Sequence, residues 1–133
     1  MLEVIEFHLD PQTGLSPYRQ LVRQVRQALR LGLLREGEQL PTVKEVVAQL
    51  AINPNTVLKA YRELEHEGLV AARAGVGTFV TASLAVASPE ATERLRGQLR
   101  RWLAEAHREG LDDEGIEALF ATTLRDDTHE DIA

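Results

Sequence analysis

The sequence predicts a mainly α-helical protein with one small β-hairpin, and three observations lead to this fold class. Apolar residues recur at helical spacing in five segments, which predicts five helices. Two short β-prone runs flank a glycine-rich turn, which predicts a hairpin. A segment of small residues that ends in Pro89 separates the last two helices from the rest, so the 133 residues are expected to form two small units.

Composition excludes several classes of protein. The chain has no cysteine, and therefore no disulfide, thiolate metal site or cysteine nucleophile, and its four histidines lie far apart in the sequence. No apolar run approaches the roughly 20 residues that a membrane span needs, and no signal-peptide pattern opens the chain. We expect a cytoplasmic protein that has no metal or other cofactor and does not bind membranes.

The net charge of −6 is unevenly distributed along the chain. Residues 16–80 hold nine basic and six acidic side chains, whereas residues 81–133 hold six basic and twelve acidic ones. A mildly basic segment joined to an acidic one predicts that the two parts perform different tasks.

The N-terminal part is expected to contain an extended segment and then a helix. Residues 3–9 suit a short strand or an extended arm, which the turn-prone residues 10–14 close. Ser16 is a candidate N-cap, and Pro17 suits the first helical position. The apolar residues at helical spacing are Tyr18, Leu21, Val22, Val25, Leu29 and Leu33. The opposite side carries a basic stripe of Arg19, Arg23, Arg26 and Arg30, which is either a solvated face or, at one end, a phosphate contact.

Two short helices follow in close succession. Thr42 and Glu45 have the spacing of a capping box, which starts a helix with an apolar side of Val43, Val46, Val47 and Leu50. Asn53 is a good N-cap and Pro54 suits the first position of the next helix, whose end Gly68 marks. The buried side of this helix is expected to hold Val57, Ala60, Tyr61 and Leu64. Such a pair of helices has the spacing of a helix-turn-helix.

The hairpin completes a winged helix-turn-helix. Residues 69–72 and 78–80 are the strand candidates, and the glycines between them suit a tight turn. Three helices followed by a hairpin is the element order of that fold. We place this domain at residues 1–82 and a short helical segment at residues 83–133.

The polar side of the third helix has the chemistry of a DNA-reading surface. Asn55 suits a bidentate contact to adenine, Thr56 a phosphate or a thymine methyl, and Lys59 a guanine or a phosphate. Lys44 projects near the same groove, and Arg73 and the glycines of the hairpin suit phosphate and minor-groove contacts. Each residue alone also fits ordinary exposed surface, and the glycines also fit a turn with no other role.

Two C-terminal helices are expected, separated by a break at residues 110–112. Leu95, Leu99, Trp102, Leu103 and Ala106 mark the first helix, and Ile116, Leu119, Phe120 and Leu124 mark a shorter second one. Two helices cannot bury these faces on each other alone, so we expect them to pair with a second copy of the chain. The alternative is that they fold back on the winged helix. The acidic and polar residues 125–133 are expected to fray.

Four stretches resemble the GntR family of bacterial transcription regulators: residues 40–45, residues 53–61, residues 64–70 and residues 75–80. The likeness spans residues 14–82, and the Asn-Pro-Asn-Thr opening at 53–56 together with the short C-terminal part is similar to the YtrA-like subfamily. The resemblance implies that Lys44 stands where the family usually has a base-contacting arginine and that Gly75 to Thr78 form the wing. It also implies that the last two helices serve dimerisation. Lys44 lacks the arginine fork, and Val76 occupies a wing position that is often basic.

These inferences predict a transcription regulator, by resemblance a repressor, that binds an inverted-repeat operator as a homodimer. Its expected partners are double-stranded DNA and a second copy of itself, and the sequence identifies no effector. The predicted DNA-binding residues are Lys44, Asn53, Asn55, Thr56, Lys59, Arg62, Arg73, Gly75, Gly77 and Thr78. The predicted dimerisation residues are Leu95, Leu99, Trp102, Leu103, Ile116, Leu119 and Phe120.

Two other functional classes compete with this one. A winged helix that binds only other proteins, with the acidic C-terminal part as its docking surface, is the alternative. Catalysis is disfavoured, because Gly75 and Gly77 lack the third glycine of a dinucleotide fingerprint, and His66-Glu67 has Val70 where a zinc-binding histidine would stand.

Overall fold

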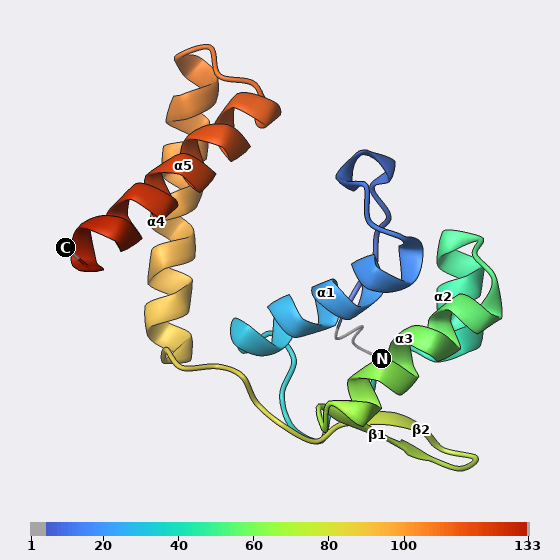
Figure 1. The fold of residues 1–133 in the computed structure, drawn as a ribbon. Coiled ribbons are helices and arrows are strands. Elements are labelled where there is room, and N and C mark those ends of the chain that lie inside the picture. The colour runs from blue at the N-terminus through green and yellow to red at the C-terminus, as the bar shows by residue number, and fades with distance from the viewer. Residues whose placement is uncertain (1–4, 133) are drawn as a thin grey trace. The chain divides into compact units, whose positions relative to one another are not determined.

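The computed structural model describes residues 5–132 and divides into two compact units, with the division between Pro89 and Glu90 (Figure 1). The division lies a few residues beyond the predicted domain boundary at 82. Ala82 and Leu84 are partly buried against the core of the first unit, so the start of the connecting segment packs with that unit.

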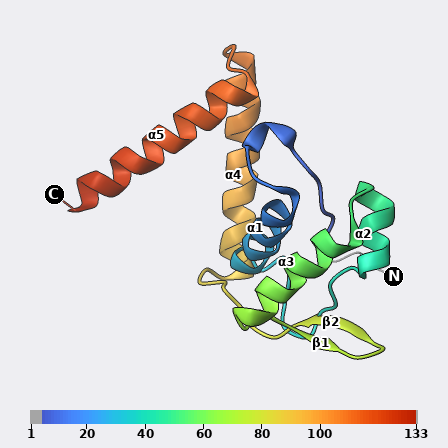
Figure 2. The same ribbon diagram turned by 45° about the vertical axis from the view of Figure 1, so that its right-hand side comes forward.

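The first unit has the predicted mainly α-helical architecture with one hairpin. Its elements are a 3-10 helix η1 (Pro11–Thr13), α1 (Pro17–Arg30), α2 (Val43–Leu50), α3 (Pro54–His66), β1 (Val70–Arg73) and β2 (Gly77–Val80). The two strands are antiparallel, with Val70 opposite Val80 and Arg73 opposite Gly77. In both views of the ribbon, the hairpin extends from the C-terminal end of α3 (Figures 1 and 2).

Local capping fixes the starts of α2 and α3 where the sequence predicts them. The Thr42 hydroxyl accepts a hydrogen bond from the Glu45 amide at 3.1 Å, and the Asn53 side chain accepts one from the Asn55 amide at 2.9 Å. Between the helices, Ala51 closes α2 in the left-handed region, at φ 54°. This conformation costs a residue with a Cβ atom about 1 kcal/mol or more, and it allows α3 to begin after only two further residues.

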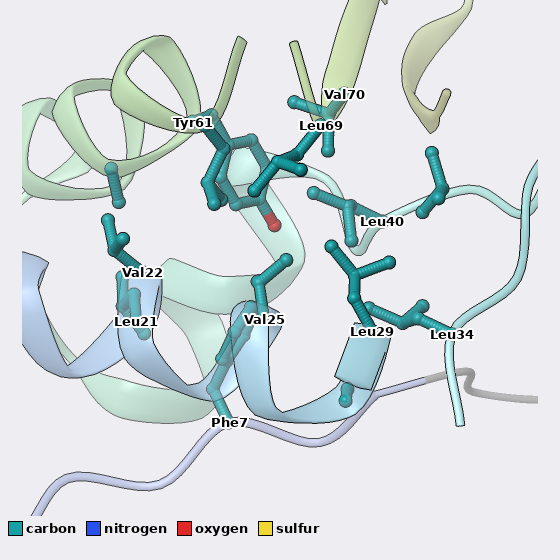
Figure 3. Close-up of a cluster of buried hydrophobic side chains, with 14 of the residues drawn as sticks. Phe7, Leu21, Val22, Val25, Leu29, Leu34, Leu40, Tyr61, Leu69 and Val70 are labelled. Carbon is teal, nitrogen blue, oxygen red and sulfur yellow. The ribbon is translucent and has the colours of Figure 1, made fainter. Parts of the chain in front are cut away.

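The core of the first unit lies between α1, α3 and the hairpin (Figure 3). Its fully buried large side chains are Phe7, Leu21, Val25, Leu29, Leu34, Leu40, Val46, Val57 and Leu64. All but Phe7, Leu34 and Leu40 come from the helical stripes that the sequence predicts.

The N-terminal segment is an extended arm, and residues 5–9 form no strand. Phe7 anchors the arm in the core, at 2% exposure. The Gln24 side chain substitutes for a neighbouring strand, because it accepts from the His8 amide at 3.1 Å and donates to the His8 carbonyl at 2.7 Å. Buried Gln20 bonds the Asp10 backbone in the same two-sided way. The predicted residues 3 and 4 lie outside the described part of the chain.

The extended segment before α2, residues 37–40, pairs with strand β2 of the hairpin. The Leu40 amide donates to the Thr78 carbonyl and the Val80 amide donates to the Glu38 carbonyl, both at 2.8 Å, while the Gly37 amide donates to the Val80 carbonyl at 2.9 Å. Gln39 pairs with Phe79 as an isolated bridge, so the chain before α2 braces β2 along its free edge.

The second unit contains α4 (Pro89–Arg108) and α5 (Asp113–Ile132). The expectation of a shorter second helix with a frayed tail is wrong, because α5 continues from Leu124 to Ile132. The hydroxyls of Thr122 and Thr128 donate to the carbonyls four residues earlier, at 2.9 Å each, so these residues satisfy their polar groups within the helix. No described helix of either unit is both long and apolar enough to span a bilayer.

Candidate nucleic-acid interface

The exposed side of α3 carries the residues that were predicted to read DNA. Val57, Ala60, Tyr61 and Leu64 are buried. Asn55, Lys59 and Arg62 are exposed on the opposite side, and Thr56 is half-buried at its margin. The helix therefore presents a polar face over its first two and a half turns, which is the part that a recognition helix inserts into the major groove.

Tyr61 fixes α3 against the start of α2. Its hydroxyl donates a 2.6 Å hydrogen bond to the Pro41 carbonyl. Burial, and to a smaller extent the nearby Glu45 carboxylate, raise the pKa of Tyr61 well above its usual range, so the hydroxyl stays protonated and keeps this bond. The bond holds the polar face of α3 at a fixed orientation relative to Lys44, which is exposed on α2.

Lys59 lies on the side of α3 that adjoins α1. Its ammonium group stands 4.1 Å from the centre of the Tyr18 ring, within the range of a cation–π contact. Sequence reasoning assigned Tyr18 only to the apolar stripe of α1 and gave it no part in the interface. The sequence shows an aromatic residue at helical spacing, but no local pattern predicts its contact with a lysine some forty residues later.

Asn53 has a structural task in addition to its predicted DNA contact. Its Oδ1 atom caps α3, which leaves the side-chain amide nitrogen as the group free to contact another molecule. Asn53 ends the turn between α2 and α3 and lies two residues before exposed Asn55.

The wing is shaped by two glycines and by Gln39. Gly75 and Gly77 have φ of 75° and 145°, which disfavour side chains. The Gln39 side chain donates to the Val76 carbonyl at 3.3 Å and lies so close to Gly77 that a Cβ atom there would overlap it. Nothing in the sequence marked Gln39, because it precedes Leu40 in a segment without periodicity.

The basic side chain of the wing is held on an aromatic ring. The Arg73 guanidinium lies 4.6 Å from the centre of the Phe79 ring on the opposite strand. Arg73 is exposed, and Thr78 is half-buried on the same hairpin. The stacking limits the rotamers of Arg73, so its positive charge stays on one face of the hairpin.

Two acidic residues attach α3 to its neighbours. The Glu65 carboxylate accepts a 2.7 Å hydrogen bond from the Ala72 amide on β1, which ties the wing to the helix. Glu67, just after α3, forms an ion pair with Arg26 of α1. Arg26 therefore has an intramolecular partner, whereas the Arg19, Arg23 and Arg30 side chains of the same basic stripe are exposed.

The second unit exposes most of the residues predicted for dimerisation. Leu95, Leu99, Leu119 and Phe120 are between 42% and 55% exposed, Trp102 and Leu103 are half-buried, and Ile116 is buried. An open groove of about 290 Å³ runs between α4 and α5. Its lining is Leu99, Trp102, Leu103, Ile116, Glu117 and Phe120. Across residues 5–132, no group of three or more histidine, aspartate or glutamate side chains is arranged to hold a metal ion.

Comparison with known proteins places the chain among transcription regulators. A family model for bacterial regulatory proteins of the gntR family matches residues 17–80. The HTH-type transcriptional repressor YtrA of Bacillus subtilis is 32% identical over 105 residues, which cover 78% of this chain and 81% of YtrA.

Two solved structures are similar to this chain. YtrA from Sulfolobus acidocaldarius, a GntR-family transcription factor, is similar with a TM-score of 0.53 and 27% identity, covering 73% of this chain and 96% of that one. The DNA-binding domain of AraR in complex with operator ORX1 is similar with a TM-score of 0.50 and 26% identity, covering 56% and 93%.

The region matched by the family model runs from the start of α1 to the end of β2, so it contains the whole helix-turn-helix and the wing. The match to YtrA of Bacillus subtilis extends beyond that region, over most of both chains. The chain therefore belongs to the GntR family of bacterial transcription regulators.

Proposed function

We propose that this regulator is a repressor that binds an inverted-repeat operator as a homodimer. The observation that supports DNA binding best is the shared attachment of α3 and the wing: Glu65 of α3 holds the Ala72 amide of β1. A polar helix face and a basic hairpin fixed to each other suit simultaneous contact with a major groove and the adjacent backbone or minor groove.

The proposed base contacts come from α3, and the proposed phosphate contacts surround it. Asn55 and Arg62 extend from the exposed face of α3, while Lys44, Lys59 and Arg73 carry positive charge around it. With only nine basic against six acidic side chains in residues 16–80, non-specific attraction to DNA is modest. Affinity for an operator then depends strongly on the base contacts.

The proposed dimer forms through α4 and α5. Of the described residues in this unit, only Ala106 and Ile116 are buried in the single chain, so most of the apolar face remains in water. A second copy would cover the groove lined by Leu99, Trp102 and Phe120. Two copies related by a two-fold axis match an inverted repeat. The proposed repressor role is that of YtrA from Bacillus subtilis, the transcriptional repressor to which this chain is similar.

A mobility shift on duplex DNA from the region upstream of the chain's own gene tests DNA binding. At matched salt, Lys59→Ala and Asn55→Ala are each expected to lower the affinity about tenfold, because each removes one phosphate or base contact. Arg100→Ala, an exposed arginine of α4, is the matched control and leaves the affinity unchanged within about twofold. Unchanged affinity of both α3 variants would contradict the assignment of this face.

The same experiment separates DNA binding from a purely protein-binding winged helix. We expect the logarithm of the affinity to fall linearly with the logarithm of the salt concentration, with a smaller slope for Lys59→Ala. Stable protein partners recovered after nuclease treatment, with no shift on any duplex, would support the protein-binding alternative. In vivo, loss of the gene should raise expression of the adjacent operon if the regulator represses it.

A further inference from the structure

One apolar side chain interrupts the polar face of α3. Leu58 is 36% exposed, although the other large apolar side chains of α3 are buried. It lies one turn after Asn55 and one turn before Arg62, both of which are exposed. The side chain can neither donate nor accept a hydrogen bond, so it reads no polar base edge.

The position of Leu58 around the helix places it on the flank that leads to the wing. Leu58 and Glu65 are seven residues apart, which puts them on the same side of α3, two turns from each other. Glu65 binds the Ala72 amide of β1, so this side is the one to which the wing is attached. Lys59, one residue further along, instead faces Tyr18 of α1.

A duplex that contacts both α3 and the wing must lie against the flank that they share. Leu58 then faces the major groove between the proposed contacts of Asn55 and Arg62. The major groove has one apolar group on its base edges, the C5-methyl of thymine. Apart from small base C–H groups, the other groups there are hydrogen-bond donors or acceptors, and a leucine would displace their water without replacing the hydrogen bond.

We infer that Leu58 is a specificity-determining residue that packs on a thymine C5-methyl group at one position of each operator half-site. This inference rests on the proposed function, because it needs α3 in a major groove. It adds that one base pair is selected through an apolar contact, so the operator requires a thymine at that position even though no side chain bonds its polar edge.

The test uses the whole 133-residue chain and removes one thymine methyl group of the DNA at a time. Selection from a randomised duplex library first gives the preferred site. Each thymine of that site is then replaced in both half-sites by deoxyuridine, which pairs identically but lacks the methyl group. At one thymine position we expect deoxyuridine to weaken wild-type binding about fourfold per half-site, the effect of one buried methyl-sized group.

The matching variant is Leu58→Ala. It is expected to bind the thymine site more weakly than the wild type does, and to bind the thymine and deoxyuridine sites equally well. Leu31→Ala removes a leucine of similar exposure, 45%, after α1, and should discriminate thymine from deoxyuridine as the wild type does. A thermal melt of each variant confirms that the first unit is folded.

Two results would overturn the inference while leaving the proposed function in place. One is a selected site at which every deoxyuridine replacement is neutral for the wild type. The other is a Leu58→Ala variant that keeps the wild-type preference for thymine. A selection that enriches no sequence would overturn the proposed function, and the inference would fall with it.

Discussion

The two units of this chain use their apolar residues in different ways. The winged helix-turn-helix buries sixteen apolar residues in one cluster, which takes members from the arm, all three helices and the hairpin. The helical hairpin of α4 and α5 is also rich in apolar residues, but of those described it buries only Ala106 and Ile116. The first unit has one contiguous core, whereas the second leaves most of its apolar residues in water.

The difference shows which of the two units buries its apolar faces within a single copy. Helices α1 to α3 place their apolar stripes against one another, so their packing determines the polar face of α3. Helices α4 and α5 each have twenty residues and yet leave Leu95, Phe120 and Leu124 more than half exposed. Long helices with exposed apolar stripes are typical of surfaces that a second chain covers.

The largest expected effect concerns the second unit. Phe120→Glu places a charge in the groove between α4 and α5 and should convert the proposed dimer to a monomer in sedimentation velocity. Operator affinity should then fall at least about 100-fold, because the second half-site no longer binds in the same complex. Ala118→Glu adds the same charge on the other side of α5, outside the groove lining, and should remain dimeric. A Phe120→Glu variant that stays dimeric would contradict the proposed interface.

Truncating an apolar side chain should have an effect that depends on protein concentration in the second unit but not in the first. Leu64→Ala should lower the unfolding free energy of the first unit by about 3 kcal/mol, since Leu64 is fully buried. Chemical denaturation should give the same loss at all protein concentrations. Leu99→Ala removes a leucine that is 42% exposed in the single chain, and its cost should grow under conditions in which the dimer forms. If the loss of unfolding free energy were independent of protein concentration for both variants, the proposed difference between the two units would be contradicted.

The wing should respond to Gly77→Ala more than to Gly75→Ala. Both glycines have positive φ, but a Cβ atom would meet Gln39 only at Gly77. We expect Gly77→Ala to cost about 2 kcal/mol and Gly75→Ala about 1 kcal/mol in thermal unfolding. Gln39→Ala combined with Gly77→Ala should recover part of the difference. Equal costs for both glycines would show that Gln39 does not brace the wing.

An effect that is absent at neutral pH is a pH dependence that arises in the first unit. The pKa of Tyr61 is raised in the folded chain, whereas in the unfolded chain this phenol ionises near its ordinary value of 10.0. The resulting stability is present below pH 10 and is lost above it, by about 1.4 kcal/mol per pH unit. Denaturation curves between pH 9 and 11 should show a steeper decline for the wild type than for Tyr61→Phe. Parallel declines would contradict this role of Tyr61.

Local signals in the sequence were enough to predict the helices and hairpin of the first unit. The capping box at Thr42 and Glu45, the Asn53-Pro54 start and the apolar stripes act within one or two turns, so the sequence reveals them directly. The exposed polar face of α3 follows from the same periodicity. The contacts of Lys59 with Tyr18 and of Gln39 with the wing join segments far apart in the chain, and no local pattern encodes them.

The errors have equally local causes. Gln24 bonds the His8 backbone on both sides, which gives a β-prone segment a partner without a strand. The polarity of residues 125–133 led to the prediction that they fray. Formation of α5 depends instead on helix propensity and on threonine hydroxyls that bond carbonyls of their own helix. Polarity alone therefore predicts the exposure of residues 125–129 correctly and their disorder incorrectly.

The pairing of residues 37–40 with β2 makes a closed loop of the chain that contains α2 and α3. Gly37 and Val80 meet at its base, so both helices are inserted between two chain segments that are hydrogen-bonded to each other. Closing this loop costs conformational entropy, which the packing of the enclosed helices must offset. The two ends of this loop are themselves anchored in the core, because Leu40 and Val80 are both buried beside the hydrogen bonds that join the two segments.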